Sequence, residues 1–255
     1  MRYGVHLCYD GSGFAGWQRQ INAMSVQQEL EDKLSLLLKS ETAVTGCGRT
    51  DTGVHAFNFF AHFDAELIAD TDEFVYHWNA MVNPGIHIFK MFTVSDDWNA
   101  RFAATRRTYR YFILRQRNPF LSRYAGFVPY AIDIDKMRKA ASALAGTHDF
   151  TSFAKLHGGQ NNGICHVYHA EIFERDGLII FEISADRFIR NMVRAITGTL
   201  LEIGRGRISA ESISEIMQAC DRSQAGASVP AHGLFLSEVH YGNDPDVPEN
   251  RKAFF

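Results

Sequence analysis

The strongest constraint on the fold is the order of predicted elements, which is nearly the same in both halves of the chain. In the first half, alternating apolar side chains predict a strand over residues 2–9. A capping box at Ser25 and Gln28 predicts the start of a helix that runs to about residue 39. The elements that follow are strands over 42–47 and 57–63, a helix over 72–81 and a strand over 86–94. This β-α-β-β-α-β order is that of the ferredoxin-like unit.

The second half repeats this order approximately, with a hairpin around Asp176-Gly177 as its clearest signal. Its expected strands are 106–116, 164–174, 178–184 and 234–241, and its expected helices are 133–145, 186–203 and 210–220. The repeat is one of element order only, because no residue-level repeat is visible. We therefore expect an α+β fold of two ferredoxin-like units, residues 1–104 and 105–255. Their strands would merge into one mixed, largely antiparallel sheet with a central cleft, and the tail from 242 would be loosely held.

The composition excludes several classes of protein. Of 255 residues, 46% are hydrophobic and 22% are charged, which is enough for a core and excludes a disordered chain. The chain lacks an apolar run of about 18 residues, so we expect no membrane span. The N-terminus has no signal-peptide core, and the four cysteines are scattered, so the expected compartment is the cytoplasm. With no CxxC pair and no HExxH spacing, we expect no bound metal.

The net charge of −3 hides an uneven distribution of basic residues. Arginine supplies 19 of the 26 basic side chains, and residues 98–130 contain seven arginines and no acid. A second cluster of five arginines lies within residues 187–207, whereas acids gather in 64–73. Such segregation is typical of a protein with one basic face for nucleic acid. The alternative is a set of solvated surface strands, and charge alone leaves both open.

The loop over residues 46–56 (GCGRTDTGVHA) has the composition of a functional turn. Three glycines within eight residues bend the chain between two predicted strands. Asp51 in this loop has two interpretations: it hydrogen-bonds its own backbone in an Asx turn, or it points into a cleft as a nucleophile or base. We expect Trp17 and Phe14, in an earlier glycine-rich loop, to pack in the core rather than to stack on RNA.

This loop closely resembles the GRTDxGVHA motif of the tRNA pseudouridine synthases that modify positions 38, 39 and 40 of the anticodon arm. Further stretches resemble the family in the same order: 9–20 (YDGSGFAGWQRQ), 25–30, 101–111, 148–153, 191–204 and 233–236. The resemblance covers residues 3–241. The departures are Thr52 where alanine is commoner, Phe14 where tyrosine is commoner, and 229–231 (VPA) for Ala-Pro-Pro. None of them removes a group that the chemistry needs.

The resemblance implies an isomerase that converts uridine to pseudouridine in the anticodon stem-loop of tRNA. The reaction breaks the bond from uracil N1 to C1′ and rejoins the base through C5, so it needs no cofactor. Asp51 would supply an ionised carboxylate, and whether it attacks the ring, attacks the sugar or removes a sugar proton stays open. Arg194 would keep that carboxylate charged, because burial alone would raise its pKa. Tyr109 would stack on the target uracil, and a further role for it in proton transfer stays open.

The same resemblance implies that Arg49 holds the flipped nucleotide out of its helix. Strand alternation puts Arg107 and Tyr109 on one face, and we expect Arg107 and Arg110, like the other arginines of this region, to contact the RNA backbone. The predicted helix over 186–203 would place Arg187, Arg190 and Arg194 on one side. The family resemblance also implies a homodimer.

Two other functions are compatible with part of this pattern. A non-catalytic RNA-binding module built from tandem ferredoxin-like folds would explain the arginines and tyrosines, but it leaves Asp51 without a role. A metal-free hydrolase with an aspartate nucleophile would use Asp51. It usually needs a second carboxylate, and the sequence indicates none nearby.

Overall fold

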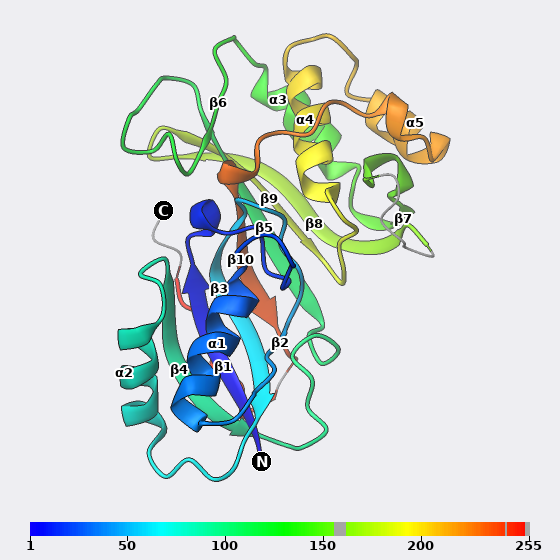
Figure 1. The fold of residues 1–255 in the computed structure, drawn as a ribbon. Coiled ribbons are helices and arrows are strands. Elements are labelled where there is room, and N and C mark those ends of the chain that lie inside the picture. Colours follow the sequence, from blue (N-terminus) through cyan, green and yellow to red (C-terminus); the bar gives the residue numbers. More distant parts are fainter. Residues whose placement is uncertain (156–161, 243, 253–255) are drawn as a thin grey trace. The chain divides into compact units, whose positions relative to one another are not determined.

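A computed structural model describes residues 1–155, 162–242 and 244–252, and the chain forms two compact units (Figure 1). Unit 1 consists of Met1–Thr105 together with the chain from Phe235 onward, and unit 2 consists of Arg106–Leu234. Both units combine a sheet with helices, so the α+β class is confirmed. Within the described residues, no helix is long and apolar enough to cross a membrane.

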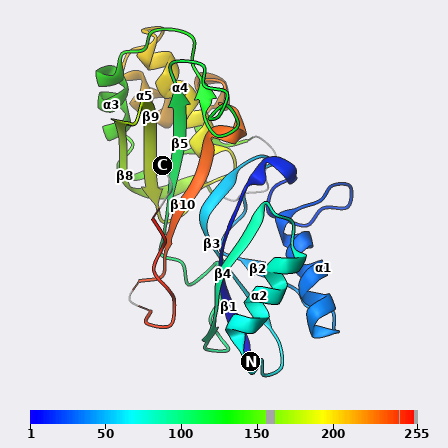
Figure 2. The ribbon, with the colours of Figure 1, turned by 90° about the vertical axis from the view of Figure 1, so that its left-hand side faces the viewer.

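Unit 1 has the predicted order of elements, and its sheet runs β4-β1-β3 with antiparallel neighbours, β2 pairing with β3. The elements are β1 (Arg2–Tyr9), α1 (Val26–Leu38), β2 (Thr45–Gly46), β3 (His55–Asp64), α2 (Thr71–Met81) and β4 (Ile86–Val94). Figure 2 shows both helices on one side of this sheet. Helix α1 begins as predicted, because Ser25 Oγ accepts a hydrogen bond from Gln28 N at 3.2 Å.

Unit 2 contains an antiparallel sheet in the order β5-β9-β8-β7, with β6 parallel to β5. Its elements are β5 (Arg106–Leu114), β6 (Gly126–Phe127), α3 (Ile134–Ser142), β7 (Gly146–Asp149), β8 (Ile164–Arg175), β9 (Leu178–Ala185), α4 (Met192–Gly204) and α5 (Ser212–Ala219). The predicted hairpin is confirmed: Asp176 and Gly177 have φ values of 51° and 77° between β8 and β9. Two consecutive positive φ values are what a two-residue hairpin turn of type I′ requires.

The last strand corrects the predicted division of the chain. Strand β10 (Leu234–His240) pairs in parallel with β3, Phe235 opposite His55 and Leu236 opposite Ala56, so this end of the chain belongs with unit 1 rather than with residues 105–234. The reason is the shortness of β2. That strand covers β3 only at Ala61 and His62, and β10 pairs with the uncovered start of β3. The merged sheet and the central cleft stay predictions.

The C-terminal segment is also held more firmly than expected. The side chain of Asn58 accepts a hydrogen bond from Arg251 N at 2.8 Å and donates one to Arg251 O at 2.9 Å. Asn250 makes the equivalent pair of bonds to the backbone of Val239, both at 2.9 Å. Residues 250 and 251 are therefore attached to the rest of unit 1 through side-chain amides. The prediction of a loosely held tail is wrong for these residues, whereas 243 and 253–255 lie outside the described part of the chain.

Helix α4 begins six residues later than predicted. Asp186 turns the chain, because its carboxylate accepts hydrogen bonds from His166 N at 2.9 Å and Arg187 N at 2.6 Å. Asn191 then adopts a left-handed conformation with φ 71°, which ends the turn directly before the helix. Arg187 and Arg190 therefore precede α4 and share no helix face with Arg194, so the prediction that these three arginines lie on one side of a helix is wrong.

We expect the buried His6 to make folding sensitive to acid. Its ring is 2% exposed, stacks on Phe60 at 4.4 Å and lies 2.8 Å from Asn58 Oδ1. Burial, together with the charge of Arg251, lowers the pKa of His6 to about 4, although the Asn58 hydrogen bond opposes this. The unfolded chain binds the His6 proton more tightly than the folded chain does. The contribution of neutral His6 to the free energy of unfolding is therefore fully present above pH 6.5, and about 3 kcal/mol of it is lost as the pH falls toward 4.

Urea unfolding followed from pH 7 to pH 4 tests this expectation. The variant His6→Gln keeps an N–H donor toward Asn58 and should lose part of the acid sensitivity. The matched control is His77→Gln, at an exposed position on α2. An identical pH dependence in wild type and His6→Gln would contradict the assignment.

Candidate active site

Asp51 lies in a closed turn of unit 1 between β2 and β3. Val54 N donates a hydrogen bond to Asp51 O at 3.1 Å, and Gly53 follows with φ 77°. A side chain at Gly53 would be strained, so the glycine is required by the turn. Asp51 is half-buried. Its backbone is therefore held in a defined conformation next to the start of β3.

The glycine-rich loop that follows β1 supports this turn from the other side. Trp17 N donates to Thr50 O at 3.2 Å, and the hydroxyl groups of Tyr9 and Thr50 are hydrogen-bonded at 2.9 Å. A Cβ at Gly16, whose φ is 87°, would collide with Thr50 O. A Cβ at Gly11 would collide with the carbonyl oxygen of Val54. The two loops therefore form one assembly, in which the glycines allow backbone to touch backbone.

His55 ties the same two loops together. Its ring is 1% exposed and stacks on Phe235 of β10 at 4.4 Å. Gly11 N donates to His55 Nδ1 at 3.1 Å, and Asp10 Oδ1 lies 3.0 Å from the same nitrogen. Sequence reasoning assigned no function to His55 and missed this role. The sequence did contain a signal for this contact, namely two glycine-rich loops, one after the first predicted strand and one around Asp51.

The aromatic residues of the first loop are part of the core, as predicted. Trp17 stacks on Phe59 at 4.0 Å, and both Trp17 and Phe14 are buried. Arg49, two residues before Asp51, is exposed and donates from Nε to Gln18 Oε1 at 3.0 Å. The loop that carries Asp51 thus also carries an accessible cation, the guanidinium of Arg49.

Tyr109 and Arg107 lie on β5 in unit 2, on the same face of the strand by alternation. The Tyr109 ring meets Phe188 edge to face at 5.1 Å, and Phe188 belongs to the turn before α4. Arg107 Nη1 donates to Asp186 O at 2.9 Å. These two of the predicted substrate-binding residues are therefore anchored to one turn, residues 186–191.

Arg194 lies in the first turn of α4 and holds the segment that precedes β10. Its Nε donates to Val229 O at 2.9 Å, and Val229 N donates to Arg194 O at 3.2 Å. The next carbonyl, Pro230 O, accepts from the Tyr111 hydroxyl at 3.0 Å. Burial raises the pKa of Tyr111, while the nearby charge of Arg194 lowers it. Arg194 therefore lies close to Tyr111, which shares the β5 face of Tyr109.

Arg110 is separated from this group, because alternation places it on the opposite face of β5. Its guanidinium forms an ion pair with Glu182, whose other oxygen lies 3.0 Å from His169 Nε2. Donor atoms of His169, Glu171 and Glu182 lie within 4.8 Å of one another, as in a metal site. The Glu182 carboxylate is already satisfied by two protein partners, so the geometry gives Arg110 a structural role.

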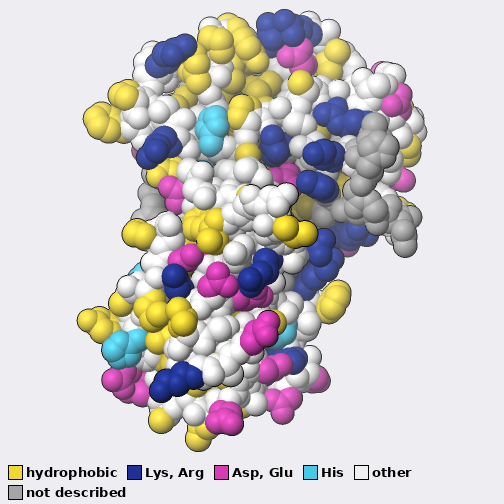
Figure 3. All heavy atoms as spheres, in the orientation of Figure 1, with side chains coloured by type: hydrophobic (Ala, Val, Ile, Leu, Met, Phe, Trp, Pro, Cys, Tyr) yellow, Lys and Arg dark blue, Asp and Glu magenta, His cyan; other side chains and the backbone are white. Residues whose placement is uncertain are grey.

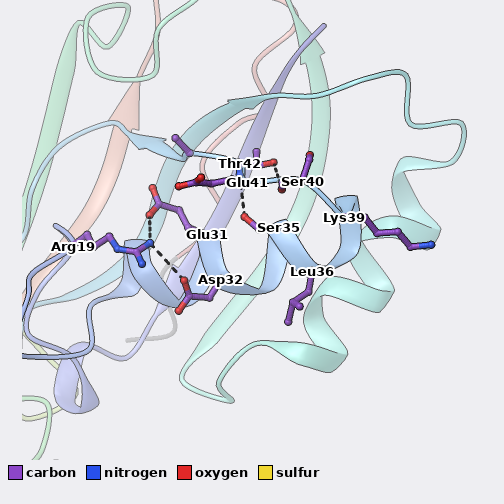
Figure 4. Close-up of a pocket in the computed structure, with 10 residues that line it drawn as sticks. Arg19, Glu31, Asp32, Ser35, Leu36, Lys39, Ser40, Glu41 and Thr42 are labelled. Atoms are coloured by element: carbon purple, nitrogen blue, oxygen red, sulfur yellow. Dashed lines mark hydrogen bonds and ion pairs between the residues drawn. The ribbon is translucent and has the colours of Figure 1, made fainter.

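A pocket of about 600 Å³ lies elsewhere in unit 1, beside α1 (Figure 4). Arg19, which lines this pocket, forms ion pairs with Glu31 at 3.0 Å and with Asp32 at 3.5 Å. Glu31 also accepts from Val44 N at 3.0 Å. This network fastens the end of the first loop to α1, and the pocket contains none of the predicted site residues.

Comparisons with known proteins place this chain in one class, the pseudouridine synthases. A family model described as tRNA pseudouridine synthase matches residues 140–242. Relatives named tRNA pseudouridine synthase A come from Bacteroides thetaiotaomicron, 43% identical over 99% of this chain and 95% of the relative, and from Parabacteroides distasonis, 42% identical over 94% and 96%. The chain belongs to the tRNA pseudouridine synthase A family.

A chain from a solved Cbf5-Nop10-Gar1 complex matches 82% of this chain and 44% of its own length. The identity is 13% and the TM-score is 0.36, a likeness too small to support an argument.

Substituting Gly16 should distort the Asp51 turn. Gly16→Ala combines a positive φ with a collision at Thr50 O, so we expect a loss of about 1–3 kcal/mol in the free energy of unfolding. Gly48→Ala is the matched control, because a Cβ there meets no atom within 4 Å. Chemical denaturation of both variants measures the difference. Equal stability of the two would show that the contact between the loops is unimportant.

Proposed function

We propose that this chain converts uridine to pseudouridine in tRNA, at positions 38, 39 and 40 of the anticodon arm. Its membership of the tRNA pseudouridine synthase A family supports this proposal. The observation that carries it is the Asp51 turn. This turn lies within the motif that resembles the family, and backbone contacts from a second loop hold it in place. A binding module has no need for a carboxylate held in this way.

In the proposed mechanism, Asp51 acts as an ionised carboxylate at the target nucleotide. The N1–C1′ bond breaks, the uracil turns, and C5 bonds to C1′; the proton at C5 leaves and N1 takes up a proton, so the product is an isomer of the substrate. The atoms balance without an oxidant or reductant. Arg194 from unit 2 supplies a positive charge that stabilises the negative charge of this carboxylate.

The target base must leave its stack before Asp51 can act on it. Tyr109 stacks on the uracil, and base–aromatic stacking contributes about 1–3 kcal/mol. The edge contact with Phe188 holds the Tyr109 ring, and Arg107 is fixed through Asp186 in the same turn. Arg49 is exposed, so its guanidinium is accessible to a phosphate or base of the displaced nucleotide.

The proposal extends to assembly and compartment. Resemblance to the family supports a homodimer, and the tRNA substrate supports a cytoplasmic location. Sedimentation velocity at micromolar concentration should give the mass of a dimer. A single species of 28.8 kDa would contradict the dimer without affecting the proposed reaction.

Asp51→Asn should abolish pseudouridine formation while preserving tRNA binding. Asparagine keeps the size of the side chain but cannot act as a nucleophile or base, so we expect turnover to fall by at least about a hundred-fold. Tritium release from tRNA labelled at uracil C5 measures turnover, and filter binding measures affinity. Thr52→Ala is the control, at an exposed neighbour in the same turn. Unchanged turnover in Asp51→Asn would favour the binding module or place the chemistry elsewhere.

A further inference from the structure

The segment that joins β5 to β6, residues 115–125, forms an ordered loop on unit 2 (Figure 1). Its end returns to β5, because Ile113 pairs with Gly126 and Leu114 with Phe127. The loop also has hydrogen bonds of its own. Asn118 Oδ1 accepts from Phe120 N at 2.9 Å, and Asn118 O accepts from Ser122 N at 2.9 Å. The loop therefore presents its side chains from a fixed backbone.

These side chains are unusual for a surface loop. Phe120 is 86% exposed, and Arg115, Arg117 and Arg123 are exposed around it. The guanidinium of Arg117 lies over the ring of Phe127 at 5.0 Å. Figure 3 shows basic and apolar side chains together over this part of unit 2. An exposed phenylalanine among cations has no function in the packing of the unit itself.

The arginines of this loop differ from others of unit 2 in their partners. Acids neutralise several arginines elsewhere in the unit: Arg110 pairs with Glu182, Arg138 with Asp135, and Arg207 with Glu202. Within the described residues, no ion pair joins Arg115, Arg117 or Arg123 to an acid. The stretch from 98 to 132 contains no acid at all. The positive charge of the loop is thus available to an external anion.

We propose that the loop of residues 115–125 is a second RNA-docking element, which binds tRNA away from the target uridine. Arginines that contact phosphates and an aromatic ring that stacks on a base are the chemistry by which proteins hold RNA without reading its sequence. An acidic peptide would use the charge but not the exposed ring. A membrane surface would need a larger apolar area than one phenylalanine. This inference rests on the proposed function.

The distance along β5 separates the loop from the proposed base-stacking residue. Tyr109 and Leu114 are five positions apart, which is about 17 Å at roughly 3.3 Å per residue. The loop lies beyond Leu114, in the same unit. The loop therefore contacts nucleotides other than the one on Tyr109, and it contributes affinity rather than chemistry.

The test compares tRNA binding by the full-length wild type and two variants. Arg115→Gln/Arg117→Gln/Arg123→Gln should bind unmodified tRNA about ten-fold or more weakly, and its logarithmic salt dependence should be less steep by about two to three, near one per phosphate contact. Phe120→Ala should weaken binding about five-fold or more. Turnover at saturating tRNA should be unchanged in both. Arg207→Gln is the control, because Glu202 already neutralises that exposed guanidinium.

Hydroxyl-radical footprinting of tRNA locates the contact. Wild type should protect nucleotides outside the anticodon arm, and the triple variant should lose that protection alone. Wild-type affinity in both variants would overturn the proposal. So would lost protection confined to the anticodon arm, or a changed sedimentation coefficient that made the loop a contact between subunits. Absence of pseudouridine formation by wild type would refute the proposed function instead, while affinities and footprints would still test the loop.

Discussion

The packing of one backbone against another around Asp51 is the constraint on which the rest of the site depends. Gly11 and Gly16 bring the first loop within van der Waals distance of the Asp51 turn, at positions where a Cβ would collide with a carbonyl oxygen. Hydrogen bonds of Trp17 and Tyr9 with Thr50, and the buried His55, add directional contacts. Such a turn has few alternative conformations. A reaction that depends on the placement of one carboxylate benefits because positioning within a fraction of an ångström decides the rate.

Unit 2 shows how one strand can serve two purposes. Successive side chains of β5 point to opposite faces of the sheet, so Arg107, Tyr109 and Tyr111 face the start of α4, whereas Arg110 pairs with Glu182 on the other face. The first face combines a half-buried tyrosine with polar anchors, and the second carries an ion-pair network. Two residues of the same type on one strand, such as Arg107 and Arg110, can therefore have different functions. The turn over 186–191 is the element that connects α4 to the face of β5 that carries Arg107 and Tyr109.

The arginines of this acidic protein separate into two groups by their partners. Some hold the fold together, as Arg19 does at Glu31 and Asp32 and Arg2 at Asp64. Others stand in the loop before β6, where Phe120 is exposed and no acid occurs nearby in the sequence. A net charge of −3 is thus compatible with a polyanionic substrate. Local charge, rather than the sum over the chain, sets the attraction between surfaces that approach within about 8 Å in physiological salt.

The sequence by itself determined the features whose causes are local. The capping of α1 by Ser25, the Asp176-Gly177 turn and the alternation of β5 each depend on residues a few positions apart, and the motif around Asp51 identified the family. Only the tertiary structure decided the pairing of β10 with β3, the attachment of Arg251 to Asn58 and the late start of α4. Those features depend on partners far apart in the chain, or on the left-handed conformation of Asn191, which the hydrophobic periodicity of the sequence does not predict. The same holds for the contact of Gly16 with the Asp51 turn, because a short sequence pattern records a residue's own conformation but not which distant backbone will lie against it.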